Sequence, residues 1–229
     1  MAFKKLILPF TLLLGVLLLD QGLKFWVKAH MDYPFNQRNL PYEIPIWGDW
    51  FKLHFVENDG MAFGIRPGGD DGKIWLTLFR IVLAAGGLFY LFNLIKKNAH
   101  LMLIACVAVI IAGALGNIID SVFYGVWYKD INAYQGGFFY GQVVDMLYFP
   151  LWDGIFPQWL PFWGGEHFLF FSPVFNLADS AISVGLFSII LFQNWLFNQD
   201  QKDANQENPP LSEENNPLAS TTEGSPENV

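Results

Sequence analysis

Cysteine and charged residues are both scarce in this 229-residue chain. It has one cysteine, Cys106, so no intrachain disulfide can form and a cysteine-rich zinc site is excluded. The four histidines are scattered without an HExxH-type pairing, and we expect no metal ion and no organic cofactor. No basic stripe or binding motif points to nucleic acid as a partner. Only 15% of the residues are charged and 53% are hydrophobic, which makes a membrane protein the first expectation.

Four apolar segments are long enough to cross a bilayer, because about 20 helical residues span about 30 Å of hydrocarbon. They cover roughly residues 6–27, 74–95, 101–123 and 174–197. The first imitates a secretory signal, but no small-x-small cleavage site follows it, so we expect a retained helix. Two long loops, at about 28–73 and 124–173, connect the spans. The acidic tail at 198–229 is predicted to be disordered.

Basic residues beside the spans predict their orientation. They lie before the first span and in the brief gap between the second and third: Lys4, Lys5, Lys96 and Lys97. By the positive-inside rule these ends lie in the cytoplasm, and four spans return the tail there too. We therefore expect a multi-pass protein with both termini cytoplasmic and both long loops on the outer side.

The first long loop contains an alternating stretch from Trp50 to Val56, followed by Asn58-Asp59-Gly60. This pattern predicts a short β-hairpin on the outer membrane face. The expected fold is an all-α membrane protein with four transmembrane helices, a small extracytoplasmic hairpin and an insert in the second outer loop.

Polar residues inside the spans pair up at helical spacing. Asp20 and Lys24 lie four apart on the first helix, which favours an ion pair; a structural role and a catalytic one are both open. In "AGALGNIIDS" (112–121), Ala112 and Gly116 make a small-xxx-small step that lets another helix approach. Asn117 and Asp120 share one face of this third helix, where Asp120 either binds loop amides or has a direct chemical role.

Two further carboxylates are candidates for chemistry. Asp145 is surrounded by apolar residues in "GQVVDMLYFP", and such a setting raises the pKa of a carboxyl group by desolvation. Asn176 and Asp179 lie three apart at the start of the fourth helix, where the helix dipole favours a carboxylate. Asp145 and Asp179 can therefore meet at the outer membrane surface. Two acids that share a proton and a water are the arrangement of aspartic proteases.

Other catalytic schemes fit less well, and two rival functions remain. Cys106 sits mid-span without a neighbouring histidine, and the lysine well inside a span, Lys24, has Asp20 beside it, which disfavours a Ser–Lys pair. Intramembrane acids also mark ion paths, so the main alternative is a non-catalytic transporter or proton-relay protein. A scaffold that binds lipidated peptides is the third possibility.

Five sequence boxes occur in order over residues 1–197: Asp20-Gln21…Lys24, "ENDGMAFG" (57–64), "GALGNIIDS" (113–121), "VVDM" (143–146) and "FNLADSAISVG" (175–185). Together they resemble the lipoprotein signal peptidase family, also called signal peptidase II. The resemblance implies a membrane aspartic endopeptidase of the bacterial cytoplasmic membrane. Such an enzyme cuts diacylglyceryl-modified prolipoproteins before the lipid-bearing cysteine, at the extracytoplasmic side and in contact with membrane lipid. It also implies that peptide-type inhibitors of the family occupy the Asp site.

The resemblance assigns roles residue by residue. Asp145 and Asp179 match the catalytic pair. The residues matching those that hold the substrate or shape the site are Asn58, Gly60, Asn117, Asp120, Asn176, Asp20 and Lys24.

The chain departs from the family pattern in two places. The third box usually ends Asp-Arg, and here it ends Asp120-Ser121, so another cation must replace that arginine; Arg66, Arg80 and Lys129 are the candidates. The segment between the two acids is also longer, with an aromatic, proline-rich insert at 149–173. This insert is either an extended lid or a membrane anchor.

Overall fold

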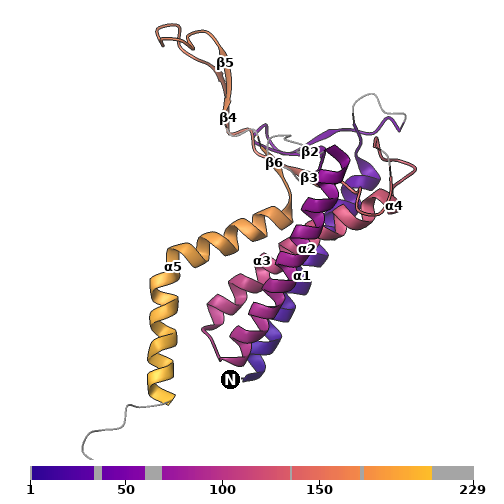
Figure 1. Ribbon diagram of the computed structural model, residues 1–229. Coiled ribbons are helices and arrows are strands. Elements are labelled where there is room, and N and C mark those ends of the chain that lie inside the picture. Colours follow the sequence, from indigo (N-terminus) through magenta and orange to yellow (C-terminus); the bar gives the residue numbers. More distant parts are fainter. Residues whose placement is uncertain (1, 34–37, 60–68, 135, 171–172, 208–229) are drawn as a thin grey trace, which may run out of the picture.

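The computed structural model of the protein describes residues 2–33, 38–59, 69–134, 136–170 and 173–207 (Figure 1). Four long helices are present at the four predicted spans: α1 (Ala2–His30), α2 (Gly69–Lys96), α3 (Leu101–Ile119) and α5 (Leu177–Glu207). Each is long and apolar enough to cross a membrane, which confirms the four predicted spans. Large apolar side chains remain exposed on these helices, among them Trp75, Phe89 and Leu191, as expected where a helix faces lipid.

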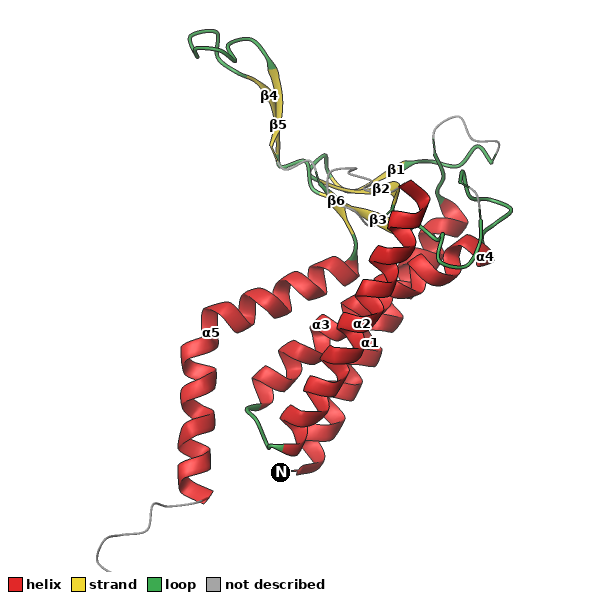
Figure 2. Ribbon diagram, viewed as in Figure 1, coloured by secondary structure: helices red, strands yellow, loops and turns green. Residues whose placement is uncertain are grey.

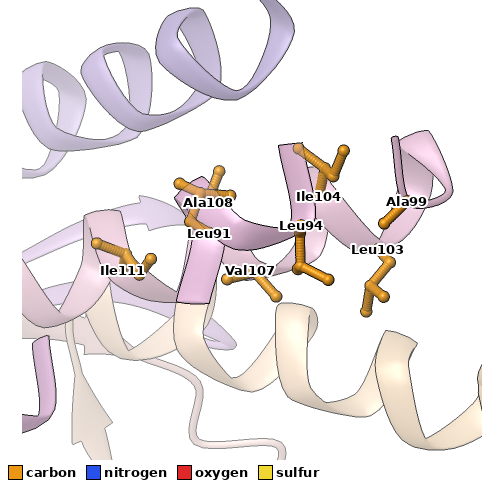
Figure 3. Close-up of a cluster of buried hydrophobic side chains, with 8 residues drawn as sticks. All are labelled: Leu91, Leu94, Ala99, Leu103, Ile104, Val107, Ala108 and Ile111. Atoms are coloured by element: carbon orange, nitrogen blue, oxygen red, sulfur yellow. The ribbon is translucent and has the colours of Figure 1, made fainter. Parts of the chain in front are cut away.

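Helix α3 is the central helix and the most buried of the four. Near its first turns it packs against the end of α2 through a cluster of eight buried apolar side chains (Figure 3): Leu91, Leu94, Ala99, Leu103, Ile104, Val107, Ala108 and Ile111. At its other end it continues into a π-helical turn, η2 (Asp120–Tyr124), and a short helix, α4 (Gly125–Trp127). Such turns often occur at functional sites, because they redirect the side chains of a helix.

Small residues on α3 let α5 approach very closely. A Cβ atom added at Gly113 would collide with the backbone oxygen of Ala178, and one at Gly116 would lie 2.6 Å from Oδ2 of Asp20. The expected close approach of another helix is therefore confirmed at Gly116. Gly113, about one turn earlier on α3, makes a second close contact with α5. It brings the start of α5 against the middle of the bundle.

The expectation of an all-α fold is wrong, because both long loops contribute strands to one antiparallel sheet. Its order is β1 (Glu43–Trp47), β2 (Phe51–Asn58), β3 (Val143–Tyr148) and β6 (Val174–Phe175). Buried residues of this sheet, Phe55, Val144 and Met146, form a core with Val27 and Tyr124 of the helices. The sheet is therefore attached to one end of the helix bundle, away from the chain's N-terminus (Figure 1).

The predicted hairpin exists, but its turn is in a different place. The chain turns at residues 48–50, where Gly48 has φ +54°, and Trp47 pairs with Phe51. Asn58 is the last residue of β2 and pairs with Val143 on β3. The predicted turn at Asn58-Asp59-Gly60 includes Gly60, which lies outside the described residues.

The insert contains a hairpin of its own, and the last helix extends into the predicted tail. Within 149–173 the strands β4 (Trp152–Ile155) and β5 (His167–Phe170) form a second, separate hairpin, which projects away from the helices and the sheet (Figure 2). Helix α5 bends along its length and continues to Glu207 (Figure 1), so the predicted disorder does not begin at residue 198. Residues 208–229 lie outside the described part of the chain.

Candidate active site

The sheet and α5 together position the two candidate acids. Asp145 lies on β3, and Leu147, two residues later on the same strand, pairs with Phe175 on β6. Directly after β6 the chain enters α5, whose first turn carries Asp179. The pairing of β3 with β6 therefore brings Asp145 to the N-terminal end of α5, as the sequence predicts.

Two asparagines connect the acids. The side-chain amide of Asn176 donates to Oδ1 of Asp145 at 2.7 Å, and its side-chain oxygen accepts from the backbone amide of Asp179 at 2.8 Å. The amide of Asn117 donates to Oδ1 of Asp179 at 2.7 Å. Asn176 also donates to Asn117 at 3.3 Å, which closes the network. The structure thus brings together four of the predicted site residues.

The two acids differ in their surroundings. Asp145 is 4% exposed, and burial raises its pKa to about 7, with the nearby charge of Asp179 as the second cause. Hydrogen bonds from Asn176 and Asn58 act in the opposite direction but do not cancel the rise. The predicted upward shift of the Asp145 pKa is confirmed. Asp179 is only partly buried and lies in the first turn of α5, where free backbone amides stabilise a negative charge.

A buried ion cluster lies directly behind the acids. The ammonium of Lys24 is 2.8 Å from Asp20 and 2.7 Å from Asp120, and all three side chains are at most 1% exposed. Lys24 also donates to Oδ1 of Asn117 at 3.1 Å. Asp20 accepts from the backbone amide of Ala178 at 2.9 Å, and so holds the start of α5.

The geometry of this cluster favours the structural interpretation of Asp20, Lys24 and Asp120. Lys24 is paired with both carboxylates inside the cluster, and Asp120 accepts from the backbone amide of Val144 at 3.4 Å, beside Asp145. The cluster therefore orients Asn117, β3 and α5 rather than facing the two acids itself.

Asn58 lies at the edge of the site, where its amide is 3.4 Å from Oδ2 of Asp145. Gly60, the other predicted residue of this box, lies outside the described residues. Next to Asn58, Glu57 forms a buried ion pair with Lys28 at 2.7 Å. This pair connects the sheet to α1.

Ser121 does not replace the missing arginine. It is 1% exposed, and its hydroxyl donates to the backbone oxygen of Asn117 within its own helix. Among the three candidate cations, Arg66 lies outside the described residues and Lys129 is exposed on a loop. The guanidinium of Arg80 is attracted by the carboxylates of Asp179 and Asp145. Arg80 is therefore the described candidate whose charge acts on the site.

Arg80 occupies the inward face of α2. Lys73, Thr77 and Ala84 lie on the same face and are 7%, 1% and 6% exposed. Ala84, one turn after Arg80, packs against Ile118, which follows the Asn117 that binds Asp179. The face of α2 that carries Arg80 is thus the face that meets the site.

Sequence reasoning gave no role to Gln21 or to the Lys28–Glu57 pair. Gln21 donates to Asp120 at 2.9 Å and accepts from the hydroxyl of Tyr124 at 3.1 Å, which fixes the π-helical turn. The signal that could have identified Gln21 is its place between Asp20 and Lys24, as a polar residue in an apolar helix. In the part of the chain that the structure describes, no group of three or more His, Cys, Asp and Glu side chains is arranged to hold a metal ion.

Comparisons with known proteins identify the family of the chain. A family model described as signal peptidase (SPase) II matches residues 12–195. The chain is 46% identical over 192 residues to the lipoprotein signal peptidase of Porphyromonas gingivalis, covering 79% of this chain and 80% of that protein. It is 42% identical over 177 residues to the lipoprotein signal peptidase of Amoebophilus asiaticus, covering 76% and 72%.

A solved structure described as a bacterial membrane enzyme, determined by the in meso method at 1.9 Å resolution, is similar in fold. Its TM-score is 0.50 at 21% identity, over 80% of this chain and 90% of that chain.

Proposed function

The chain belongs to the signal peptidase II family, a family of proteases that process lipoproteins, and on this basis we propose that it is an aspartic endopeptidase. Its substrates are diacylglyceryl-modified bacterial prolipoproteins, which it cuts before the lipid-bearing cysteine. The observation that carries the proposal is the pair Asp145 and Asp179, joined through Asn176 and Asn117 at the start of α5.

The surroundings of the two acids support a division of labour. The raised pKa of Asp145 favours the protonated form near neutral pH, so Asp145 is the general acid. Asp179 accepts a hydrogen bond from Asn117, lies in the first turn of α5 and is only partly buried, so we assign Asp179 as the general base.

The reaction then needs only these groups and one water. Asp179 takes a proton from the water while the water oxygen attacks the scissile carbonyl carbon, and Asp145 gives its proton to the carbonyl oxygen. The resulting diol collapses as its C–N bond breaks. Asp179 returns the proton to the leaving amine, and the hydroxyl proton of the diol restores Asp145. One water is consumed, and both acids end in their starting states.

Neighbouring residues hold the substrate. Asn58 lies beside Asp145 at the C-terminal end of β2, where an extended peptide can approach both acids. Arg80 supplies the positive charge that the family places after the acid of the third box, and it balances the acids and binds a substrate carbonyl. Holding the scissile bond over the acids lowers the entropic part of the barrier.

The membrane orientation follows from the same arrangement. The N-terminus and the connection between α2 and α3, with Lys96 and Lys97, lie at the end of the bundle opposite the sheet (Figure 1). With these basic residues in the cytoplasm, the acids and the sheet face the outer side of the cytoplasmic membrane. The lipid chains of the substrate and its signal helix then share the bilayer with the exposed apolar faces of α2 and α5.

The test is cleavage of a diacylglyceryl-modified prolipoprotein by the purified protein, with mass spectrometry of the product to place the cut. Asp145→Asn and Asp179→Asn should each lose activity by several orders of magnitude while remaining folded. Asp130→Asn, on an exposed loop, is the matched control and should cut normally. Normal cleavage by either site variant would show that the acid is structural.

A further inference from the structure

The β4–β5 hairpin ends in an uncharged aromatic tip. Between residues 154 and 165 the sequence "GIFPQWLPFWGG" has no Asp, Glu, Lys or Arg. Three large side chains of this tip are strongly exposed: Trp159 at 79%, Phe162 at 91% and Trp163 at 56%. Ile155, where β4 ends, is 68% exposed as well. Such a concentration of exposed apolar area on a small loop indicates a contact surface.

The backbone of the tip is closed on itself. Phe156 and Gly165 are joined by a hydrogen bond from the amide of Gly165 at 2.9 Å, and the amide of Phe156 donates to Glu166 at 2.9 Å. Inside the tip, Leu160 binds Pro157 and Gly164 binds Leu160, each at 3.0 Å. The tip can therefore leave water with many of its backbone groups already paired, a requirement of a membrane environment.

One residue of the tip is held in an unusual conformation. Phe162 has φ +72°, a region that bulky side chains rarely adopt. The same residue is the most exposed of the tip aromatics. The loop thus adopts a strained backbone at its most exposed aromatic side chain, which is a feature of binding loops rather than of connections.

We propose that this aromatic tip, Trp159, Phe162 and Trp163, inserts into the headgroup region of the lipid bilayer. The hairpin belongs to a chain with four membrane-spanning helices, and it extends away from them (Figure 2), so it reaches beyond the bundle. Tryptophan and phenylalanine side chains suit the membrane interface, where their rings contact the apolar lipid chains.

The bilayer fits this tip better than a protein partner does. The residues 154–165 offer no charge for selecting a partner surface, and their exposed aromatic side chains are the features that can make contact.

The first experiment places a fluorescent label beside the tip and leaves its aromatics intact. In a Cys106→Ala background, Gln158→Cys carries an environment-sensitive dye in lipid nanodiscs that contain nitroxide-labelled lipids. Asp130→Cys, on an exposed loop, is the control. The dye at 158 should shift to the blue and be quenched by the nitroxide lipids, while the dye at 130 does neither. A blue shift without quenching would mean a protein contact, and no shift would mean solvent; either result overturns the proposal.

A second experiment tests the tip by function and does not depend on labelling. The triple variant Trp159→Ser, Phe162→Ser, Trp163→Ser should bind vesicle-embedded substrate less well, with KM raised and kcat kept, and should lose this defect in detergent micelles. An equal defect in both media would overturn the membrane role. Because the dye experiment measures no cleavage, it distinguishes failure of the anchor from failure of the proposed peptidase.

Discussion

Asn176 holds Asp145 through a 2.7 Å hydrogen bond from its side-chain amide, while its side-chain oxygen caps the first turn of α5 at Asp179. One fully buried residue therefore has two physical roles. It stabilises the start of a helix, and it sets the separation of the two acids. These roles can be separated, because serine is also a good helix cap but lacks the amide donor.

Replacing Asn176 should separate stability from activity. Asn176→Ala removes both the cap and the donor, so we expect a loss of about 1 kcal/mol in the free energy of unfolding. Losing a hydrogen bond aimed at a reacting group should lower kcat by about 100-fold. Asn176→Ser should keep the stability and show the same loss in kcat. Thermal unfolding and single-turnover cleavage of both variants decide this, and a fully active serine variant would contradict the role in the site.

The raised pKa of Asp145 predicts the pH dependence of cleavage. Because the protonated form acts as the acid, kcat/KM should fall above the pKa, which lies at about 7. The hydrogen bond from Asn58 lowers this pKa, so Asn58→Ala should move the alkaline limb to higher pH. Cleavage rates between pH 5 and 10, with a substrate that does not titrate there, test this. A flat profile up to pH 10 would exclude Asp145 as the acid.

The same pKa predicts an effect on stability. In the unfolded chain the carboxyl group titrates near 3.8, and in the folded protein at about 7, so the unfolded state binds fewer protons between these values. The free energy of unfolding therefore falls as pH rises from about 4 to 7, by at most about 1.4 kcal/mol per pH unit from this group. Asp145→Asn cannot ionise, so it should be more stable than the wild type at pH 8 and similar at pH 4. Unfolding in detergent at both values is the measurement.

Arg80 should act on the site through its charge. Removing it in Arg80→Gln takes away an attraction to both carboxylates, so the limbs of the pH–rate profile should move to higher pH and kcat/KM should fall. Arg80→Lys keeps the charge and should restore the pH profile in part. Lys129→Gln, which removes an exposed charge, is the control and should leave the profile unchanged. If Arg80→Gln keeps the wild-type profile, another cation replaces the family arginine.

The helices and the acids could be predicted from the sequence because their signals are local. Apolar runs of membrane length mark the four spans, and helical spacing places Asn176 with Asp179 and Asn117 with Asp120. The upward shift of the Asp145 pKa was predicted from the apolar residues beside it in the sequence, and burial is its largest cause in the structure.

The sheet could not be predicted, because its pairings join distant parts of the chain. Val143 of the second loop pairs with Asn58 of the first, and neither loop shows this register by itself. Arg80 was only one of three candidate cations, because the position of α2 against the site depends on tertiary packing.

The buried cluster behind the acids should be the most sensitive structural element. Lys24→Met leaves Asp20 and Asp120 facing each other at 1% and 0% exposure without a counter-ion, which should cost about 3–5 kcal/mol in the free energy of unfolding. Adding Asp120→Asn to this variant removes one of the two charges and should recover part of the loss. Lys52→Met breaks a partly exposed pair with Glu43 and should cost far less, so it is the control. Equal losses for Lys24→Met and Lys52→Met would show that burial does not increase the cost of removing the lysine. The start of α5 would then be held at Ala178 by packing rather than by Asp20.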